Sequence, residues 1–297
     1  MLCVLMLRMC VMTFAESSTS IPQPAPVTPN KGEYDAEYRA KRKLRKQALI
    51  ELHHDVVERE NQKLQGQDKP TNFTIGFRAR RLLRNGDVET LPQEFARILK
   101  GCEEFIENPN RFPSLRAWCD ATNNVQSRRL IAKVLACILP NTDLIGGRVG
   151  IPTEAGIRTI SYDQLQEDYA LRFGEFISPN SFKKAIQHLG HAGYFHSERI
   201  NVCVDKKGGT VRSAAAFKQF TERFFSDLKV VRYSNICQMI IATRERQKKK
   251  GLRFFWVARR LLMEGVQQIF NASTLDDYAD TTSTVFSAYQ QPQQVPL

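Results

Sequence analysis

The sequence predicts a mainly α-helical fold that carries small β-hairpins. The stretch from Glu33 to about Leu64 contains neither proline nor glycine and is dominated by good helix formers, a pattern typical of one long, highly charged helix. Apolar residues recur at spacings of three and four in several later segments, which predicts amphipathic helices. Residues 194–213 instead alternate apolar and polar side chains around a glycine-rich turn, as a β-hairpin does.

Composition divides the chain into four regions. We expect a disordered arm at 1–32, a charged helical region at 33–112, a compact domain with C-terminal helices at 113–275, and a disordered tail at 276–297. The apolar stretch Met1–Ala15 is interrupted by Arg8 and is too short to span a bilayer. We interpret Met1 as a start codon assigned too early, with translation beginning at Met9 or Met12, and a weak signal peptide is the alternative.

Charge and cysteine usage restrict the class of partner. A net charge of +12 favours a polyanion such as nucleic acid over a membrane surface, although a merely basic soluble protein is the plain alternative. The seven cysteines are scattered, and none forms a Cys-x-x-Cys pair. We therefore expect reduced core thiols in a cytoplasmic protein, with no structural metal and no cofactor.

The region 33–112 is expected to consist of helices joined by turns. Phe73–Leu83 and Pro92–Ile106 carry apolar residues at helical spacing, and the Asn85-Gly86-Asp87 turn separates them. The run Asn108–Pro113 reads as a linker and supplies the boundary to the next domain. The Asn72–Ile106 block would also suit a ligand or dimerisation region.

Two helices and a short strand open the compact domain. Ser127 is a candidate N-cap for a helix that Pro140 stops; its shared apolar face comprises Ile131, Val134, Leu135 and Ile138. The strand candidate is Ile157–Ile160. The run Ser161–Gln164 forms a capping box for a second helix ending at Gly174, with Tyr162, Leu165 and Tyr169 facing inward.

The sharpest signal is the helix that begins after Ser178. Ser178 is a good N-cap, and Pro179 occupies the first helical position, where proline is best tolerated. The buried stripe comprises Phe182, Ala185, Ile186 and Leu189. The opposite face comprises Asn180, Ser181, Lys183, Lys184, Gln187, His188 and His191. These are the side-chain types that contact base edges and phosphates in a DNA major groove.

A basic ribbon follows this helix. Glycines at 190 and 193 end the helix, an extended run alternates Ile200, Val202 and Val204, and Thr210–Ser213 returns after a turn. The cations expected to hold DNA phosphates here are Lys206, Lys207 and Arg212. The order helix, strand, helix, turn, helix, ribbon is that of a winged helix. Any small α+β domain also contains such elements, but the ordered sequence favours the winged helix.

Three further basic clusters are candidate phosphate contacts. They comprise Arg39, Arg42, Lys43 and Lys46 in the long helix, Arg78 and Arg81 in the following block, and Lys248, Lys249 and Lys250 near the end. Each cluster alone is more often a solvated face, but three in a basic chain favour phosphate contact. The Phe-rich blocks 217–228 and 254–262 read as helical core, with an oligomer surface, and hence a homodimer, as the alternative.

The sequence offers no catalytic constellation. Gly146-Gly147 lacks the Lys-Ser/Thr of a phosphate loop. His53 and His54 are adjacent and point in different directions, while His188 and His191 lack a third metal ligand. We therefore expect a protein that is not an enzyme and holds no metal.

The stretch from about Ser178 to Leu252 resembles the replication initiation proteins of IncFII-type bacterial plasmids, the RepA family. The resemblance lies in the helix and turn Asn180–Phe195, the hairpin after it, the Phe-rich segment Phe217–Leu228 and the basic run Arg244–Leu252. It implies a protein that binds double-stranded plasmid origin DNA, recruits host helicase-loading or initiator proteins, and thereby takes part in copy control. The alternatives are a winged-helix transcriptional regulator and an RNA-binding or nucleoid protein.

Overall fold

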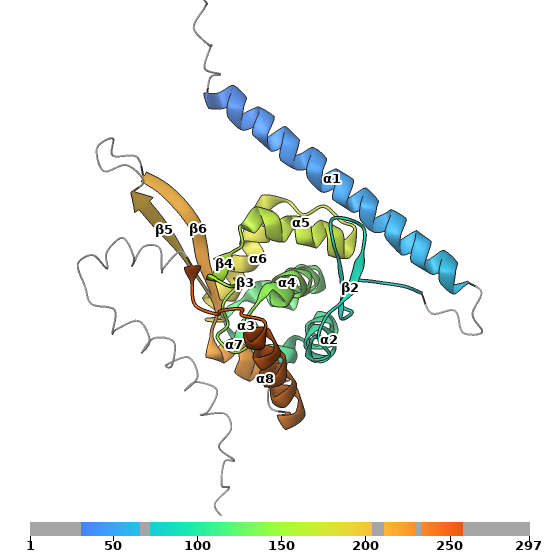
Figure 1. Ribbon diagram of the computed structural model, residues 1–297, viewed down its shortest axis with the longest axis vertical. Coiled ribbons are helices and arrows are strands. Elements are labelled where there is room, and N and C mark those ends of the chain that lie inside the picture. Colours follow the sequence, from blue (N-terminus) through green and yellow to red (C-terminus); the bar gives the residue numbers. More distant parts are fainter. Residues whose placement is uncertain (1–30, 66–71, 204–210, 230–232, 258–297) are drawn as a thin grey trace, which may run out of the picture. The chain divides into compact units, whose positions relative to one another are not determined.

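The computed structural model describes residues 31–65, 72–203, 211–229 and 233–257. The chain divides into two compact units, 1–42 and 43–297. In the described part the fold is mainly helical with three separate antiparallel strand pairs, so the predicted class of α-helices with small hairpins is confirmed (Figure 1). None of the helices in these residues combines the length and apolar character needed to cross a bilayer.

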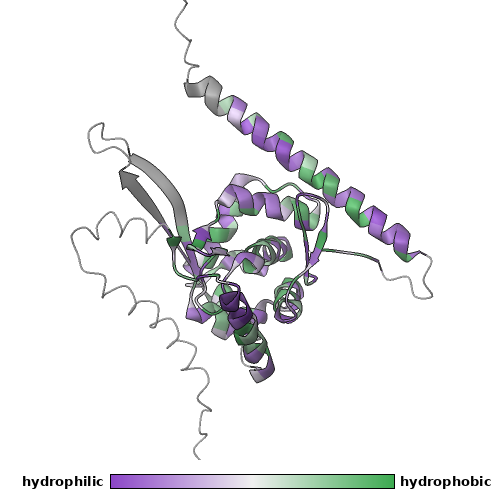
Figure 2. Ribbon diagram, viewed as in Figure 1, coloured by the Kyte–Doolittle hydropathy of each residue, from purple (hydrophilic) through white to green (hydrophobic). Residues whose placement is uncertain are grey.

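Helix α1 (Lys31–Leu64) confirms the long N-terminal helix. Hydrophilic residues dominate it in Figure 2. In the first unit, Lys41 pairs with Glu37 at 2.7 Å, and the Arg42 guanidinium lies 5.3 Å from the centre of the Tyr38 ring. In the second unit, Leu49 and Val56 are buried in a small apolar cluster with residues of the following hairpin and of helix α5 (Tyr162–Phe173).

The expected helix Phe73–Leu83 is wrong, because this segment forms a turn and strand β1 (Arg80–Leu82), which pairs with β2 (Val88–Thr90). The turn between the strands places Gly86 at a φ of +86°, a conformation that favours glycine. Arg172 of α5 explains the extended backbone. Its guanidinium donates to the carbonyl oxygens of Gly76 at 2.6 Å and Arg80 at 2.9 Å. In a helix these carbonyl oxygens would instead accept hydrogen bonds from backbone amides of the same helix.

One hydrophobic core unites the helices that follow. Helix α4 (Val125–Ile138) packs against α2 (Glu94–Glu107), α5 and α6 (Pro179–His191) (Figure 1). The core continues into α3 (Pro113–Trp118), α7 (Glu222–Leu228) and α8 (Ser234–Lys249). Helix α4 is capped by Asn124, whose side chain accepts from the Gln126 amide at 2.8 Å, and not by the predicted Ser127, which lies inside the helix.

The predicted domain boundary between residues 112 and 113 falls within this core. The fully buried Phe112 ring lies 5.1 Å from that of Phe105 and stacks on Phe224 at 5.7 Å. Residues from both sides of the boundary therefore share one apolar interior.

Three short 3-10 helices connect the α-helices; they span Pro109–Arg111, Asp120–Asn123 and Leu139–Asn141. The hairpin of β3 (Gly150–Thr153) and β4 (Gly156–Thr159) precedes α5 and confirms the strand expected near residue 157. The Phe-rich segment 217–228, predicted as one helix, is instead divided. Phe217 and Phe220 belong to strand β6 (Val211–Phe220), and α7 begins only at Glu222.

Candidate nucleic-acid interface

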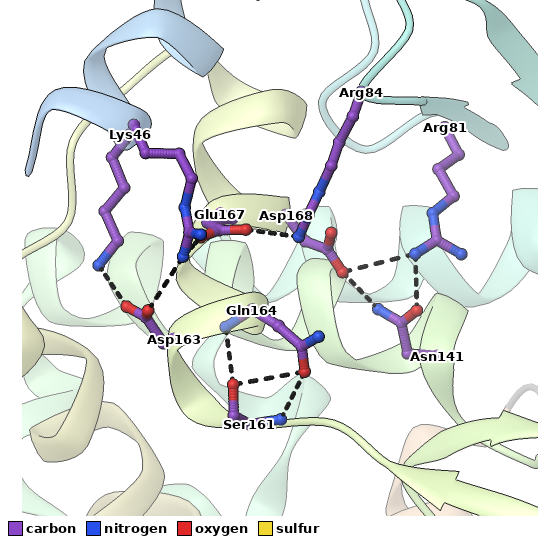
Figure 3. Close-up of polar contacts among 10 residues, drawn as sticks. Lys46, Arg81, Arg84, Asn141, Ser161, Asp163, Gln164, Glu167 and Asp168 are labelled. Atoms are coloured by element: carbon purple, nitrogen blue, oxygen red, sulfur yellow. Dashed lines mark hydrogen bonds and ion pairs between the residues drawn. The ribbon is translucent and has the colours of Figure 1, made fainter. Parts of the chain in front are cut away.

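Helices α5 and α6 form a tightly connected pair whose ends the sequence predicts correctly. The Ser161 hydroxyl accepts from the Gln164 backbone amide at 3.1 Å, and the Gln164 side-chain oxygen accepts from the Ser161 backbone amide at 3.0 Å. This is the predicted capping box (Figure 3). Gly174 ends α5 with a φ of +62°. Only four residues then separate Gly174 from the first residue of α6, so the two helices are joined by a short turn.

Helix α6 begins as predicted. The Ser178 hydroxyl accepts from the Ser181 amide at 3.0 Å, and Pro179 is the first helical residue. All four residues of the predicted apolar stripe are buried; they are Phe182, Ala185, Ile186 and Leu189. The helix continues one residue beyond Gly190, and Gly193 turns the chain with a φ of +69°. The core therefore fixes which face of α6 is turned outward.

The outward face of α6 carries most of the predicted recognition side chains. The exposed ones are Asn180, Lys183, Lys184, Gln187 and His191. Lys183 and Lys184 make no ion pair with any described residue. Over the eleven helical steps from Asn180 to His191 a helix rises about 16 Å, so these side chains form one polar strip with two available positive charges.

Two of the predicted recognition residues are less accessible. The half-buried Ser181 hydroxyl accepts a hydrogen bond from the Ser178 hydroxyl at 2.8 Å, and its backbone amide completes the helix cap. His188 is also half-buried. Burial lowers its pKa first, and the neighbouring positive charges of Lys184 and His191 lower it further. His188 is therefore held in its neutral form more strongly than a free histidine.

A ribbon follows α6, made of β5 (Phe195–Cys203) and β6, which are antiparallel with a bulge between Glu198 and Ile200. Residues 147–149 are joined to β6 by an isolated antiparallel bridge between Arg148 and Gln219. The Val149 amide donates to the Lys218 carbonyl, and the Phe220 amide to the Gly147 carbonyl, each at 2.8 Å. Lys206 and Lys207 lie outside the described residues. The backbone of Arg212 pairs with Val202, but its side chain also lies outside them.

Lys218 joins the ribbon to the helix pair. Its ammonium donates to the Ile160 carbonyl at 2.6 Å and lies 4.6 Å from the centre of the Tyr162 ring, at the start of α5. The Tyr162 hydroxyl also lies 2.9 Å from that of Ser197 in β5. Only 1% of Lys218 is exposed, and this burial lowers its pKa to about 8. Sequence patterns did not point to this residue, because lysines in a hairpin are normally exposed.

In the second unit, two basic residues of α1, Arg45 and Lys46, face carboxylates of α5, which corrects the predicted role of Lys46. Only 4% of Lys46 is exposed, and its ammonium lies 3.1 Å from Asp163 and 2.5 Å from the Gln166 side-chain oxygen. Arg45 and Arg84 both contact the buried Glu167 carboxylate (Figure 3). A buried ammonium already paired with a carboxylate is not available to a phosphate.

Arg81 is engaged in a similar way. Its guanidinium donates to the Asn141 side-chain oxygen at 2.8 Å and lies 3.5 Å from Asp168. Arg81 lies in β1, not in the predicted helix, and its position is fixed by these partners. Arg78, by contrast, is exposed.

The remaining predicted phosphate contacts are distributed over both units. In the first unit Arg39 is exposed and Arg42 is half-buried, while Lys43 is exposed in the second. At the end of α8 Lys248 pairs with Glu245 at 3.1 Å. Lys249 and Lys250 are exposed and form no ion pair within the described ranges. Among the described residues of the second unit, adjacent lysines that form no ion pair therefore lie on α6 and at the end of α8.

The described residues contain no group of three or more His, Cys, Asp or Glu side chains that is arranged to hold a metal ion. The described cysteines are free thiols, and burial raises the pKa of Cys102 to about 12. A thiol so rarely ionised is a poor nucleophile. His53, one of the adjacent histidines, is buried with its Nδ1 at 2.7 Å from the Leu171 carbonyl oxygen.

Comparisons with models of protein families, with curated protein sequences and with solved structures found no match to this chain. The function of this chain must therefore be inferred from the geometry and charge of the residues described above.

Proposed function

We propose that this chain binds duplex DNA sequence-specifically through a winged helix, with α6 as the recognition helix. The observation that carries the proposal is the outward face of α6, where amide, lysine and histidine side chains stand on a helix whose opposite face is fully buried. A helix with its side chains is about as wide as the major groove. Amides recognise adenine, and lysines recognise guanine or phosphate.

The arrangement around α6 supports this proposal. The helix follows α5 after a short turn, and the ribbon after it is tied to the start of α5 by Lys218. A ribbon held at a fixed angle to the recognition helix would place its tip, with Lys206 and Lys207, along the DNA backbone. Such contacts add affinity without sequence preference.

We further propose that the DNA is a plasmid origin and that the protein initiates replication there, with host helicase-loading or initiator proteins as its partners. This step rests on the resemblance of residues 178–252 to plasmid replication initiators. A transcriptional regulator with the same DNA contacts would bind DNA equally well but would not sustain replication. The gene with its flanking DNA should therefore allow a replicon that lacks its own initiator to persist, and failure would favour the regulator.

The DNA-binding proposal is tested by selecting preferred duplexes from a random library with the full chain. Lys183→Ala/Lys184→Ala should reduce the preference for the selected duplex over random duplex at least tenfold, since one good base contact contributes about 1–3 kcal/mol. Lys206→Ala/Lys207→Ala should weaken binding to the selected and the random duplex about equally. It should also reduce the magnitude of the slope of log affinity against log salt concentration by about 2. Fluorescence anisotropy at several salt concentrations measures both quantities.

The matched control is Arg97→Ala/Lys100→Ala, which removes two exposed positive charges from α2. It should leave the preference for the selected duplex intact. If the library yields no preferred duplex, or if the α6 variant keeps the preference of the parent, the proposal is wrong. Equal binding of RNA would point instead to an RNA-binding protein.

A further inference from the structure

A groove of about 1040 Å³ lies between the end of α8, strand β3, the 140–145 loop and the start of α2. Its apolar lining includes Phe95, Ile145, Ile151, Met239 and Phe254. Ile151 is 38% exposed, an unusual state for a large apolar side chain facing a depression. The groove therefore offers an apolar floor to a ligand with apolar side chains.

The rim of the groove is positively charged. Its cations are Arg81, Arg244, Arg246, Lys249 and Lys250, and its acids are Glu89, Glu94 and Asp143. Arg244 contacts Asp143, and Arg81 is engaged by Asp168 and Asn141. The charges left without a carboxylate in the described part of the chain are those of Arg246, Lys249 and Lys250. They lie on the last turns of α8 and favour an acidic ligand.

The chain itself contains a segment with these properties. Beyond Arg260 the sequence has four acidic residues and no Lys or Arg, although the whole chain carries +12. Three of these acids lie within Leu275–Asp280, where Leu275 and Tyr278 add apolar side chains. The nineteen steps from Val257 to Asp276 span up to about 60 Å when extended. Phe254, which lines the groove, lies only three residues before Val257.

We propose that Leu275–Asp280 binds in this groove of its own chain. Its aspartates face Arg246, Lys249 and Lys250, and its leucine and tyrosine contact the apolar floor. Because the segment is covalently attached, its effective concentration at the groove is in the millimolar range, so a weak contact is sufficient. The bound segment covers Lys249 and Lys250 and thereby withdraws them from other anions. This inference does not depend on DNA binding.

Carbodiimide cross-linking of the full chain tests the contact directly, because the reagent joins a carboxylate only to an amine that touches it. Mass spectrometry should find Lys249 or Lys250 joined to Asp276, Asp277 or Asp280 within one chain. The matched lysines Lys183 and Lys184 are equally exposed and should give no such product. Lys249→Glu/Lys250→Glu should abolish the product. Adding Asp276→Lys/Asp277→Lys to this variant should restore a cross-link, now between carboxylates at positions 249 and 250 and amines at positions 276 and 277.

Hydrogen exchange supplies a readout free of cross-linking chemistry. Asp276→Asn/Asp277→Asn/Asp280→Asn should speed amide exchange several-fold at 150–152 and 239–250, while α4 should be unchanged. Unchanged exchange in the groove, or cross-links spread equally to Lys183 and Lys184, would overturn the proposal. Products found only between ¹⁵N-labelled and unlabelled chains would also overturn it and assign the groove to a second copy.

Discussion

The buried ammonium of Lys218 makes the joint between ribbon and helix pair sensitive to pH. Burial lowers its pKa from 10.5 to about 8, whereas in the unfolded chain the amine regains its ordinary pKa. Between these two values the unfolded chain binds more protons than the folded one. The free energy of unfolding contributed by this group therefore rises with pH across that window and is constant below it.

The size of this contribution follows from the two pKa values. Integrating the difference in bound protons from pH 7.5 to pH 9.5 gives a rise of about 2 kcal/mol in the free energy of unfolding. Lys218→Met keeps a flexible chain of similar length but removes the titrating amine. The variant should lose this rise, which urea unfolding followed by circular dichroism at both pH values measures.

Other groups titrate in the same pH window, so the quantity to compare is the difference in free energy of unfolding between the parent and Lys218→Met at each pH. Burial raises the pKa of the Cys102 thiol to about 12, and such thiols lower the stability as pH rises. They are present in the parent and the variant alike and cancel in the difference. Lys100→Met, at an exposed lysine, should follow the parent. Parallel pH profiles for the parent and Lys218→Met would refute the reasoning.

Three further substitutions test the contacts that position α6 and its neighbours, each by urea unfolding at pH 7. Ser178→Ala removes the N-cap of α6 and should lower the free energy of unfolding by about 1 kcal/mol; a change below a few tenths would mean that the cap is replaced. Glu167→Gln leaves Arg45 and Arg84 beside a buried neutral amide and should cost about 2 kcal/mol. An unchanged midpoint would show that the pairs contribute nothing. Gly147→Ala places a Cβ 2.3 Å from the Phe220 carbonyl oxygen and should cost at least about 2 kcal/mol, more than Gly251→Ala, where φ is also positive but no atom lies within 4 Å.

Local signals in the sequence were sufficient for the helix pair. The capping box at Ser161, the cap at Ser178 and the stop at Gly174 are formed by residues within one turn of each other. Such contacts are visible in a short window of sequence. The outward face of α6 follows from the same periodicity, because the core buries every residue of the apolar stripe.

Contacts between distant residues explain what the sequence could not predict. The segment before Leu83 is extended because Arg172, some ninety residues later, binds its carbonyl groups. Phe217 and Phe220 lie in a strand because they pair with Glu198 and Phe195 of β5. Neither partner could be identified from periodicity, which describes one segment at a time.

The same distinction decides how the positive charge of the chain should be interpreted. A net charge of +12 states how much positive charge the protein carries, not how much of it a polyanion can reach. Lys46 and Arg81 are predicted phosphate contacts, yet Asp163 and Asp168 of α5 already face them. The acids of α5 were visible in the sequence, but their partners became apparent only from the packing of α1 and β1 on that helix. A basic cluster therefore predicts a nucleic-acid surface only where no acidic face is packed against it, as on α6.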